Sequence, residues 1–185
     1  MNVPWWLLLV VGLLAVLGLF LRGLVGRVDR LNLRVEAAWE ALDAQLVRRS
    51  IVVQEMCSSG LLDPASALLL AGAAHDAQTA SPARREAAES ALTEDLRAVL
   101  DEAAAAQELS DDPTGRQLLA DLRQASDRVV LARRFHNEAV RMCRELRGRP
   151  VVRTLRLFGR SVEPVTFEMD DAPAASLTEL PPASI

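Results

Sequence analysis

The sequence predicts an all-α protein, in which an N-terminal transmembrane helix continues into an antiparallel up-and-down helical bundle. Half of the 185 residues are hydrophobic, and most of these are Ala and Leu, which lose little conformational freedom on entering a helix. The segment 1–21 contains no charged side chain. Beyond it, apolar residues recur at helical spacing over long stretches. These three observations favour helices throughout.

Composition also narrows the function. The formal charge is −4 and all 21 basic residues are arginine, so the overall basic character typical of nucleic-acid-binding proteins is missing, and we expect no nucleic-acid partner. Two cysteines, Cys57 and Cys143, are too few for a disulfide scaffold. Phosphate loops, dinucleotide-binding glycine motifs and zinc-protease motifs are missing from the sequence, so we expect no cofactor and no metal.

The segment 1–22 is predicted to be a transmembrane anchor. A helix rises about 1.5 Å per residue, so roughly 20 apolar residues cross a hydrocarbon core of about 30 Å, and Trp5 and Trp6 suit the headgroup level at one end. A cleaved signal peptide would normally carry a basic residue before the apolar run and a small-residue cleavage site, and neither is evident. A buried core helix is the third alternative, but this run is uncharged on every face.

The orientation is predicted from the arginines. All basic residues near the apolar run lie on its C-terminal side, beginning with Arg22, Arg27, Arg30 and Arg34. Basic residues next to a membrane span stay in the cytoplasm. We therefore expect a protein of the cell membrane with its N-terminus outside and its bundle cytoplasmic.

The first bundle helix is expected over residues 24–56. Turned at 100° per residue, its apolar side chains fall in one sector, namely Val28, Leu31, Val35, Trp39, Leu42, Leu46, Val53 and Met56. Arg49 falls inside this sector. Either it lies at the edge with its head in water, or it is an internal arginine paired with a carboxylate of another helix, such as Asp127 or Glu138.

Turn residues divide the middle of the chain. Gly60 can end the first helix, and Asp63 with Pro64 can begin a helix over 64–77. Ser81 and Pro82 are expected to begin the next helix, over 83–107. Asp112 is expected to cap a helix that starts at Pro113.

The last long helix is predicted over residues 113–147, and Gly148 and Pro150 end it. Two seven-residue series mark a coiled-coil-like seam for antiparallel packing: Leu118, Ala125, Ala132, Ala139 and Leu146, and Leu122, Val129, His136 and Cys143. His136 and Cys143 could in principle hold a metal or act as a thiol–imidazole pair. Their spacing of seven differs from the three or four usual for helical metal ligands, so we expect core residues.

An arginine-rich segment follows. Residues 151–160 are expected to form a short amphipathic helix, and its arginines are either a solvated helix end or a contact with anionic headgroups. In the second case the candidate contacts are Arg153, Arg156 and Phe158, with the aromatic ring dipping into the interface. The stretch 161–168 is expected to be extended. The acidic, Pro- and Ala-rich tail over 169–185 is expected to be disordered.

Two blocks of the chain resemble the LemA family of membrane-anchored helical bundles. The block "RLNLRVEAAWEALDAQLVRR" (30–49) is similar to the family's first signature at Ala38, Trp39, Asp43, Gln45, Leu46, Arg48 and Arg49. The block over 132–159 is similar to its C-terminal signature at Ala132, Arg133, Asn137, Val140, Pro150, Phe158 and Gly159. The chain departs from the family at "SIVVQEM" (50–56), a segment that is normally polar and proline-containing. It also departs at Phe135, His136 and Cys143, which occupy aromatic positions where the family has tyrosines.

The resemblance implies a membrane-anchored bundle with no established enzymatic activity. We expect an anchor (1–22), a bundle (24–168) and a tail (169–185), acting as a non-enzymatic scaffold or protein-interaction module. The expected partners are the lipid bilayer, a protein of unknown identity, and a second copy of the chain in a homo-oligomer. The alternatives are a signalling component whose bundle switches state on binding, and an enzyme using His136 and Cys143. The residues expected in the core or at an interface are Trp39, Leu42, Leu46, Arg49, Val129, His136 and Val140.

Overall fold

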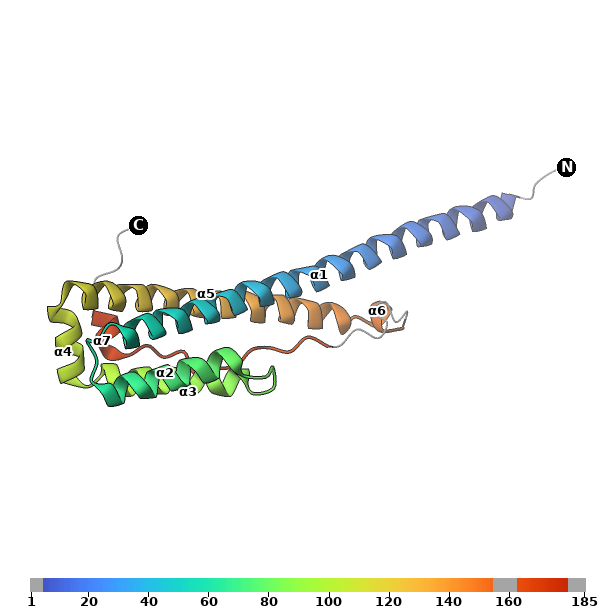
Figure 1. The fold of residues 1–185 in the computed structure, drawn as a ribbon. Helices are drawn as coiled ribbons and strands as arrows, with labels where there is room; N and C mark the ends of the chain where they lie inside the picture. The colour runs from blue at the N-terminus through green and yellow to red at the C-terminus, as the bar shows by residue number, and fades with distance from the viewer. Residues whose placement is uncertain (1–4, 155–162, 180–185) are drawn as a thin grey trace. The chain divides into compact units, whose positions relative to one another are not determined.

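The computed structural model describes residues 5–154 and 163–179, and all regular secondary structure within them is α-helical (Figure 1). The all-α prediction is therefore confirmed. In chain order the helices are α1 (Trp5–Ser58), α2 (Pro64–Thr79), α3 (Arg85–Leu100), α4 (Ala103–Asp111), α5 (Pro113–Arg147), α6 (Pro150–Thr154) and α7 (Ala175–Glu179).

The chain forms two compact units. Unit 1 comprises Met1–Ala38 and Asn137–Thr166, and unit 2 comprises Trp39–His136 and Phe167–Ile185. Both α1 and α5 therefore contribute residues to each unit. The last part of α5 groups with the N-terminal part of α1, so the two units share both long helices.

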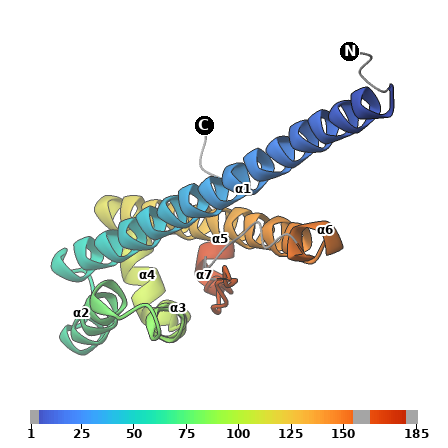
Figure 2. The same ribbon diagram turned by 90° about the vertical axis from the view of Figure 1, so that its right-hand side faces the viewer.

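Unit 2 contains the larger hydrophobic core. Its α2 and α3 lie side by side as a helical hairpin (Figure 2). Buried aliphatic side chains from α1 to α5 form one cluster, whose largest fully buried members are Val52, Val53, Met56, Leu70, Leu92, Leu100, Leu109 and Leu122. Burying each such side chain contributes roughly 1.5–3 kcal/mol before conformational entropy is counted, so this cluster is the main source of stability in unit 2.

A second cluster in unit 2 contains three predicted core residues. Leu42, Leu46 and Val129 are fully buried against one another, which confirms the helical seams read from the sequence. Phe167 and Met169 complete this cluster. Phe167 lies in the stretch predicted to be extended, and Met169 begins the tail predicted to be disordered.

Residues Phe167–Leu177, which we call the C-terminal strap, lie along α3. The backbone N–H of Glu168 donates to Glu86 (2.8 Å), and that of Asp170 donates to the hydroxyl of Ser90 (3.0 Å). Leu177, in the short helix α7, is 4% exposed and belongs to the main core. The predicted disorder of the tail is therefore wrong up to Glu179, because alternating apolar residues of the strap fill the seam left by the helices. Residues 180–185 lie outside the described part.

Two of the three predicted helix N-termini, those with Asp before Pro, are confirmed. The carboxylate of Asp63 accepts from the N–H groups of Ala65 and Ser66, and Pro64 opens α2. Asp112 does the same at the start of α5, accepting from Thr114 at 2.7 Å. These bonds satisfy backbone donors that a helix N-terminus leaves without partners.

The stretch predicted as one helix over 83–107 differs in the structure. Pro82 opens a turn, and the Arg84 N–H donates to the Ser81 carbonyl (2.9 Å), so α3 begins only at Arg85 and has no side-chain cap. A second break separates α3 from α4 after Leu100. There the Asp101 carboxylate accepts from the N–H of Ala175 in the strap (2.8 Å). This long-range bond has no local sequence signal such as Gly or Pro.

Unit 1 is built around a small apolar cluster. Val28 of α1, Leu146 of α5 and Val152 of α6 are buried together, and Leu24 and Leu31 pack against them. Gly148 ends α5 as predicted, with its N–H bonded to the Arg144 carbonyl at 2.9 Å. The predicted helix over 151–160 is seen as α6, which is described only to Thr154. Residues 163–166 have no regular secondary structure, and the extended conformation expected for 161–168 stays a prediction.

Candidate functional site: an exposed apolar helix, a buried ionic network and an arginine-rich end

The first turns of α1 have the composition and exposure of a membrane-crossing segment. The helix contains an apolar window long enough to cross a bilayer, and none of that window is buried. Its exposed large side chains include Leu9, Val10, Val11, Leu13, Leu14, Val16, Leu19 and Phe20. A soluble fold would bury such a run. By length and composition this segment fits either a membrane anchor or a signal sequence.

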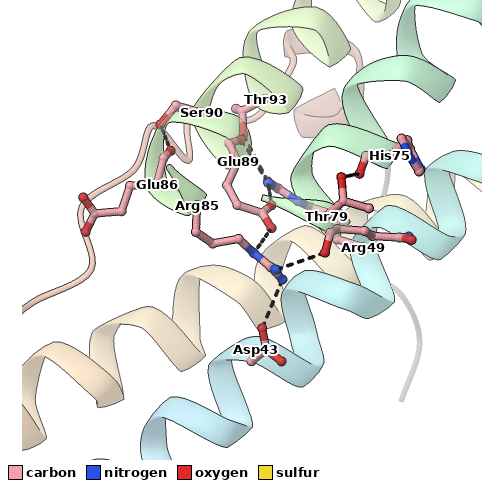
Figure 3. A network of polar contacts seen from close by, with 10 residues as sticks. Asp43, Arg49, His75, Thr79, Arg85, Glu86, Glu89, Ser90 and Thr93 are labelled. Carbon is pink, nitrogen blue, oxygen red and sulfur yellow. Dashed lines mark hydrogen bonds and ion pairs between the residues drawn. The ribbon is translucent and has the colours of Figure 1, made fainter. Parts of the chain in front are cut away.

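A buried ionic network joins α1 to α3 within unit 2 (Figure 3). Arg49, which is 3% exposed, donates from Nη2 to Oε2 of Glu89 at 2.8 Å and to the Glu89 carbonyl at 3.2 Å. Its Nη1 donates to the Thr93 hydroxyl at 3.0 Å. Glu89 itself is fully buried. Of the two alternatives that the sequence left open for Arg49, the structure shows the internal, paired arginine and not the one with its head in water, and the partner is Glu89 instead of the suggested Asp127 or Glu138.

Arg85 supplies the second cation of the network. Its Nε donates to Oε1 of Glu89 at 3.1 Å, and its Nη2 donates to Asp43 of α1 at 3.0 Å. The Asp43 side chain is 46% exposed. Two arginines and two carboxylates therefore alternate along one chain of ion pairs, from the buried Glu89 outward to solvent (Figure 3).

This arrangement is suited to fixing the docking of α3 on α1. Both oxygens of Glu89 are occupied by guanidinium groups, and the carboxylate has no solvent access, so it cannot reach a substrate. Buried ion pairs gain little net stability over an apolar core, but removal of one partner costs about 3–5 kcal/mol because a charge is left uncompensated. Sequence periodicity located Arg49 but not its partner, since the angular placement of α3 against α1 is a tertiary property.

An aromatic cluster lies beside the second core of unit 2. The rings of Trp39 and His136 meet edge to face with centroids 5.5 Å apart, and the rings of Trp39 and Phe167 are 5.7 Å apart. Trp39 is 36% exposed, so its assignment to the core needs correction: one side of the indole packs and the other faces solvent. The packing partner Phe167 comes from the C-terminal strap.

The residues considered for chemistry are buried. His136 is 4% exposed in unit 2, while Cys143 and Val140 are fully buried in unit 1. The Cys143 thiol contacts the side-chain oxygen of Asn32 at 3.6 Å. Burial raises the pKa of the other cysteine, Cys57, which disfavours a reactive thiolate. Among the described residues, no three His, Cys, Asp or Glu side chains are placed to hold a metal.

A surface groove of about 600 Å³ lies between α2 and α3. Small and apolar residues form most of its lining, and its charged residues are Asp76, Arg84 and Asp95. The pKa of Asp95 is raised, mainly because the carboxyl is partly desolvated and also because Glu94 is nearby. The described lining contains neither a histidine nor a cysteine, so no catalytic group is evident in this groove.

The arginines of unit 1 fall into two groups. Arg141 pairs with Glu138 at 2.6 Å and also with Glu145, and Arg144 pairs with Glu163 at 3.5 Å. In contrast, Arg22 and Arg27 of α1 and Arg149 and Arg153 around α6 are exposed, and they form no ion pair within the part of the chain that the structure describes. Of the predicted membrane-surface residues, Arg153 is in this second group, whereas Arg156 and Phe158 lie outside the described residues.

Fold and site together define an all-helical protein with a long N-terminal apolar helix, part of which packs with the other helices in a bundle. No protein-family model, no curated protein and no solved structure matches the chain.

Proposed function

We propose that this chain is a single-pass membrane protein whose helical bundle acts as a non-enzymatic scaffold or protein-interaction module. One observation supports this most: the apolar, uncharged turns of α1 are wholly exposed, while later turns of the same helix supply buried residues to a packed core. Exposed apolar turns are stable in an apolar environment, which the hydrocarbon core of a bilayer provides. A retained anchor explains why one continuous helix serves both environments.

The non-enzymatic part of the proposal rests on where the reactive side chains lie. His136 and Cys143 are buried in helix seams, and the fully buried Glu89 is held between two arginines. The burial of the first two side chains is explained by helix packing, and that of Glu89 by its ion pairs with two arginines. An exposed apolar residue pair on α5, Leu131 and Phe135, is a suitable contact for a protein partner.

The proposed orientation places the bundle in the cytoplasm. It is supported by the sequence pattern alone, in which the first basic residue after the apolar run is Arg22 and none precedes the run. Kinship with the LemA family is likewise supported by the two sequence blocks over 30–49 and 132–159, without a family match behind it.

Two measurements test the anchor and its orientation. The mass of the protein extracted from membranes should correspond to a chain that retains residues 1–22, and alkaline carbonate should leave it in the membrane. A tag after Ile185 should survive protease digestion of intact cells and be lost after lysis. A mature chain lacking the first 20 or so residues would show a cleaved signal sequence instead, and digestion of the tag in intact cells would reverse the orientation.

A second candidate is a signalling component whose bundle changes state on binding. The buried network of Arg49, Glu89 and Arg85 favours it, because polar elements of this type can specify one packing among several at a cost in stability. An Arg49 variant repacked to wild-type stability or above that nevertheless loses the cellular phenotype would support this candidate. A repacked variant with full function would leave the scaffold proposal as the better one.

A further inference from the structure

We propose that Arg22, Arg27, Arg149 and Arg153 form an arginine collar that binds the headgroups of anionic lipids. The inference rests on the proposed membrane anchor and names the partner of its cytoplasmic end. Four observations carry it: the depth of the residues, the packing of α6, the pattern of ion pairs and the distribution of charge.

The first observation is depth. From Trp5, a helix that rises 1.5 Å per residue reaches about 30 Å, the thickness of a hydrocarbon core, at about Val25. The headgroup layer adds roughly 5–8 Å on each side, which corresponds to about five residues of helix. Arg27 therefore lies at headgroup depth, and Arg22, three residues before Val25, reaches the same depth by extending its long side chain toward the interface. They point to different sides of α1, as suits lipids that surround a helix.

The second observation is that α6 packs at this same level of α1. Val152 of α6 is buried with Val28, and Leu24 packs against the same cluster. This contact lies within unit 1 and brings Arg149 and Arg153, which flank Val152, close to the end of the apolar run. Val151 is 46% exposed beside them, an apolar side chain suited to the interface.

The third observation is that the arginines nearest the apolar run lack protein partners. Arg141 and Arg144, farther along α5 from α6, are paired with carboxylates. The four collar arginines are exposed and have no such pair among the described residues. Asp29, the one carboxylate of α1 in this stretch, forms no ion pair with them. Guanidinium groups at headgroup depth are free to bind phosphate, which they do with two parallel hydrogen bonds.

The fourth observation is the charge of the two units. Unit 1 contains 11 of the 21 arginines and only five of the 25 acidic residues, a formal charge of +6, which leaves −10 on unit 2. The positive charge is therefore gathered in the unit that contains the apolar run. An overall acidic protein thus carries a local surface that is attracted to anionic lipid.

The test compares the full chain in two lipid nanodiscs. One is phosphatidylcholine, and the other contains about a quarter phosphatidylglycerol, enough to give a negative surface. Amide hydrogen exchange is followed at residues 151–154. In the anionic discs exchange should slow about five-fold for each arginine engaged, the factor that corresponds to about 1 kcal/mol. The slowing should disappear at about 1 M salt, where the Debye length is near 3 Å.

Variants locate the effect. Arg149→Gln with Arg153→Gln should abolish the slowing in anionic discs, and circular dichroism should show an unchanged fold because both side chains are exposed. Arg141→Gln with Arg144→Gln removes the same charge from the same unit but from paired positions, and it should retain the slowing. Equal loss in both double variants would reduce the effect to net charge and overturn the collar.

Other outcomes separate this inference from the proposed function. A chain that enters the discs but exchanges equally in both lipids retains its anchor and refutes the collar. A chain that does not enter discs refutes both. Inorganic phosphate added to phosphatidylcholine discs should have little effect. If it slows exchange as much as phosphatidylglycerol does, the site binds free anions, and the assignment to lipid headgroups is overturned.

Discussion

Replacement of Arg49 by methionine is expected to destabilise unit 2 strongly. Methionine keeps much of the length of the stem but removes the guanidinium. The change takes away the donor to Oε2 and to the carbonyl of Glu89 and the donor to the Thr93 hydroxyl. Glu89 is left fully buried with only Arg85 as its cation.

The magnitude follows from this loss. Breaking a buried pair by removing one partner costs about 3–5 kcal/mol. For a chain of this size each kcal/mol shifts the melting temperature by roughly 2–4 °C, so the expected fall is on the order of 10 °C. Thermal unfolding of the full chain in nanodiscs, followed by far-ultraviolet circular dichroism, measures it.

The neighbouring Arg48 provides a matched control. It is exposed and one position earlier on the same helix, so Arg48→Met should change stability by less than about 0.5 kcal/mol. Combining Arg49→Met with Glu89→Met should restore most of the lost stability, because no buried charge is then unpaired and Arg85 keeps Asp43. Equal stability of the two single arginine variants, or no recovery in the double variant, would refute the charge-pairing argument.

Three further predictions concern α4, α5 and the aromatic cluster. Gly115→Ala places a Cβ 2.2 Å from the Leu109 carbonyl oxygen, so thermal unfolding should show a loss of stability of about 1–3 kcal/mol or more. The control is Gly72→Ala, whose Cβ meets nothing within 4 Å and which should stabilise α2 by roughly 0.5–1 kcal/mol. A Gly115→Ala variant as stable as the wild type would contradict the close approach of Gly115 to Leu109. Trp39→Ala should cost about 1.5–3 kcal/mol, less than a fully buried tryptophan, and a melt of this variant unchanged from the parent would show that the ring contributes no packing. The pKa of Asp112 is lowered below its usual 3.8, first by the hydrogen bond from the N–H of Gly115 and then by that from Thr114. The stability advantage of the wild type over Asp112→Ala should therefore be complete above pH 3.8 and be lost as the pH falls through the lower pKa of the folded state. An advantage that persists in stronger acid would contradict the capping role of this carboxylate.

The sequence was informative where the determining interactions are local. A carboxylate followed by proline is a complete N-terminal signal within four residues, and Asp63 and Asp112 behave as predicted. Helical periodicity likewise identified Leu42, Leu46 and Val129 as buried. In each case the information lies within one or two turns of helix, so no knowledge of the tertiary arrangement was needed.

Errors arose where distant segments meet. The partner of Arg49 is 40 residues away, and nothing in the period of either helix determines how α3 is rotated against α1. The Pro and Ala content of the strap is typical of a disordered tail, but Phe167 and Met169 pack into the second core of unit 2 and Leu177 packs into the main core. Trp39 was placed in the core because its hydrophobicity is evident from sequence, whereas its exposed face is not.

The C-terminal strap has a consequence for biogenesis. Unit 2 is made from Trp39–His136 together with a segment that is synthesised only after all of Asn137–Thr166. At about 5–20 residues per second, this interval of 30 residues lasts roughly 1.5–6 s. During that time the side chains that will pack against Phe167 and Leu177 stay uncovered on the nascent chain. Unit 2 is therefore completed only after Leu177 has been synthesised, and a stop codon shortly before residue 167 would release a bundle in which the side chains that pack against the strap remain uncovered.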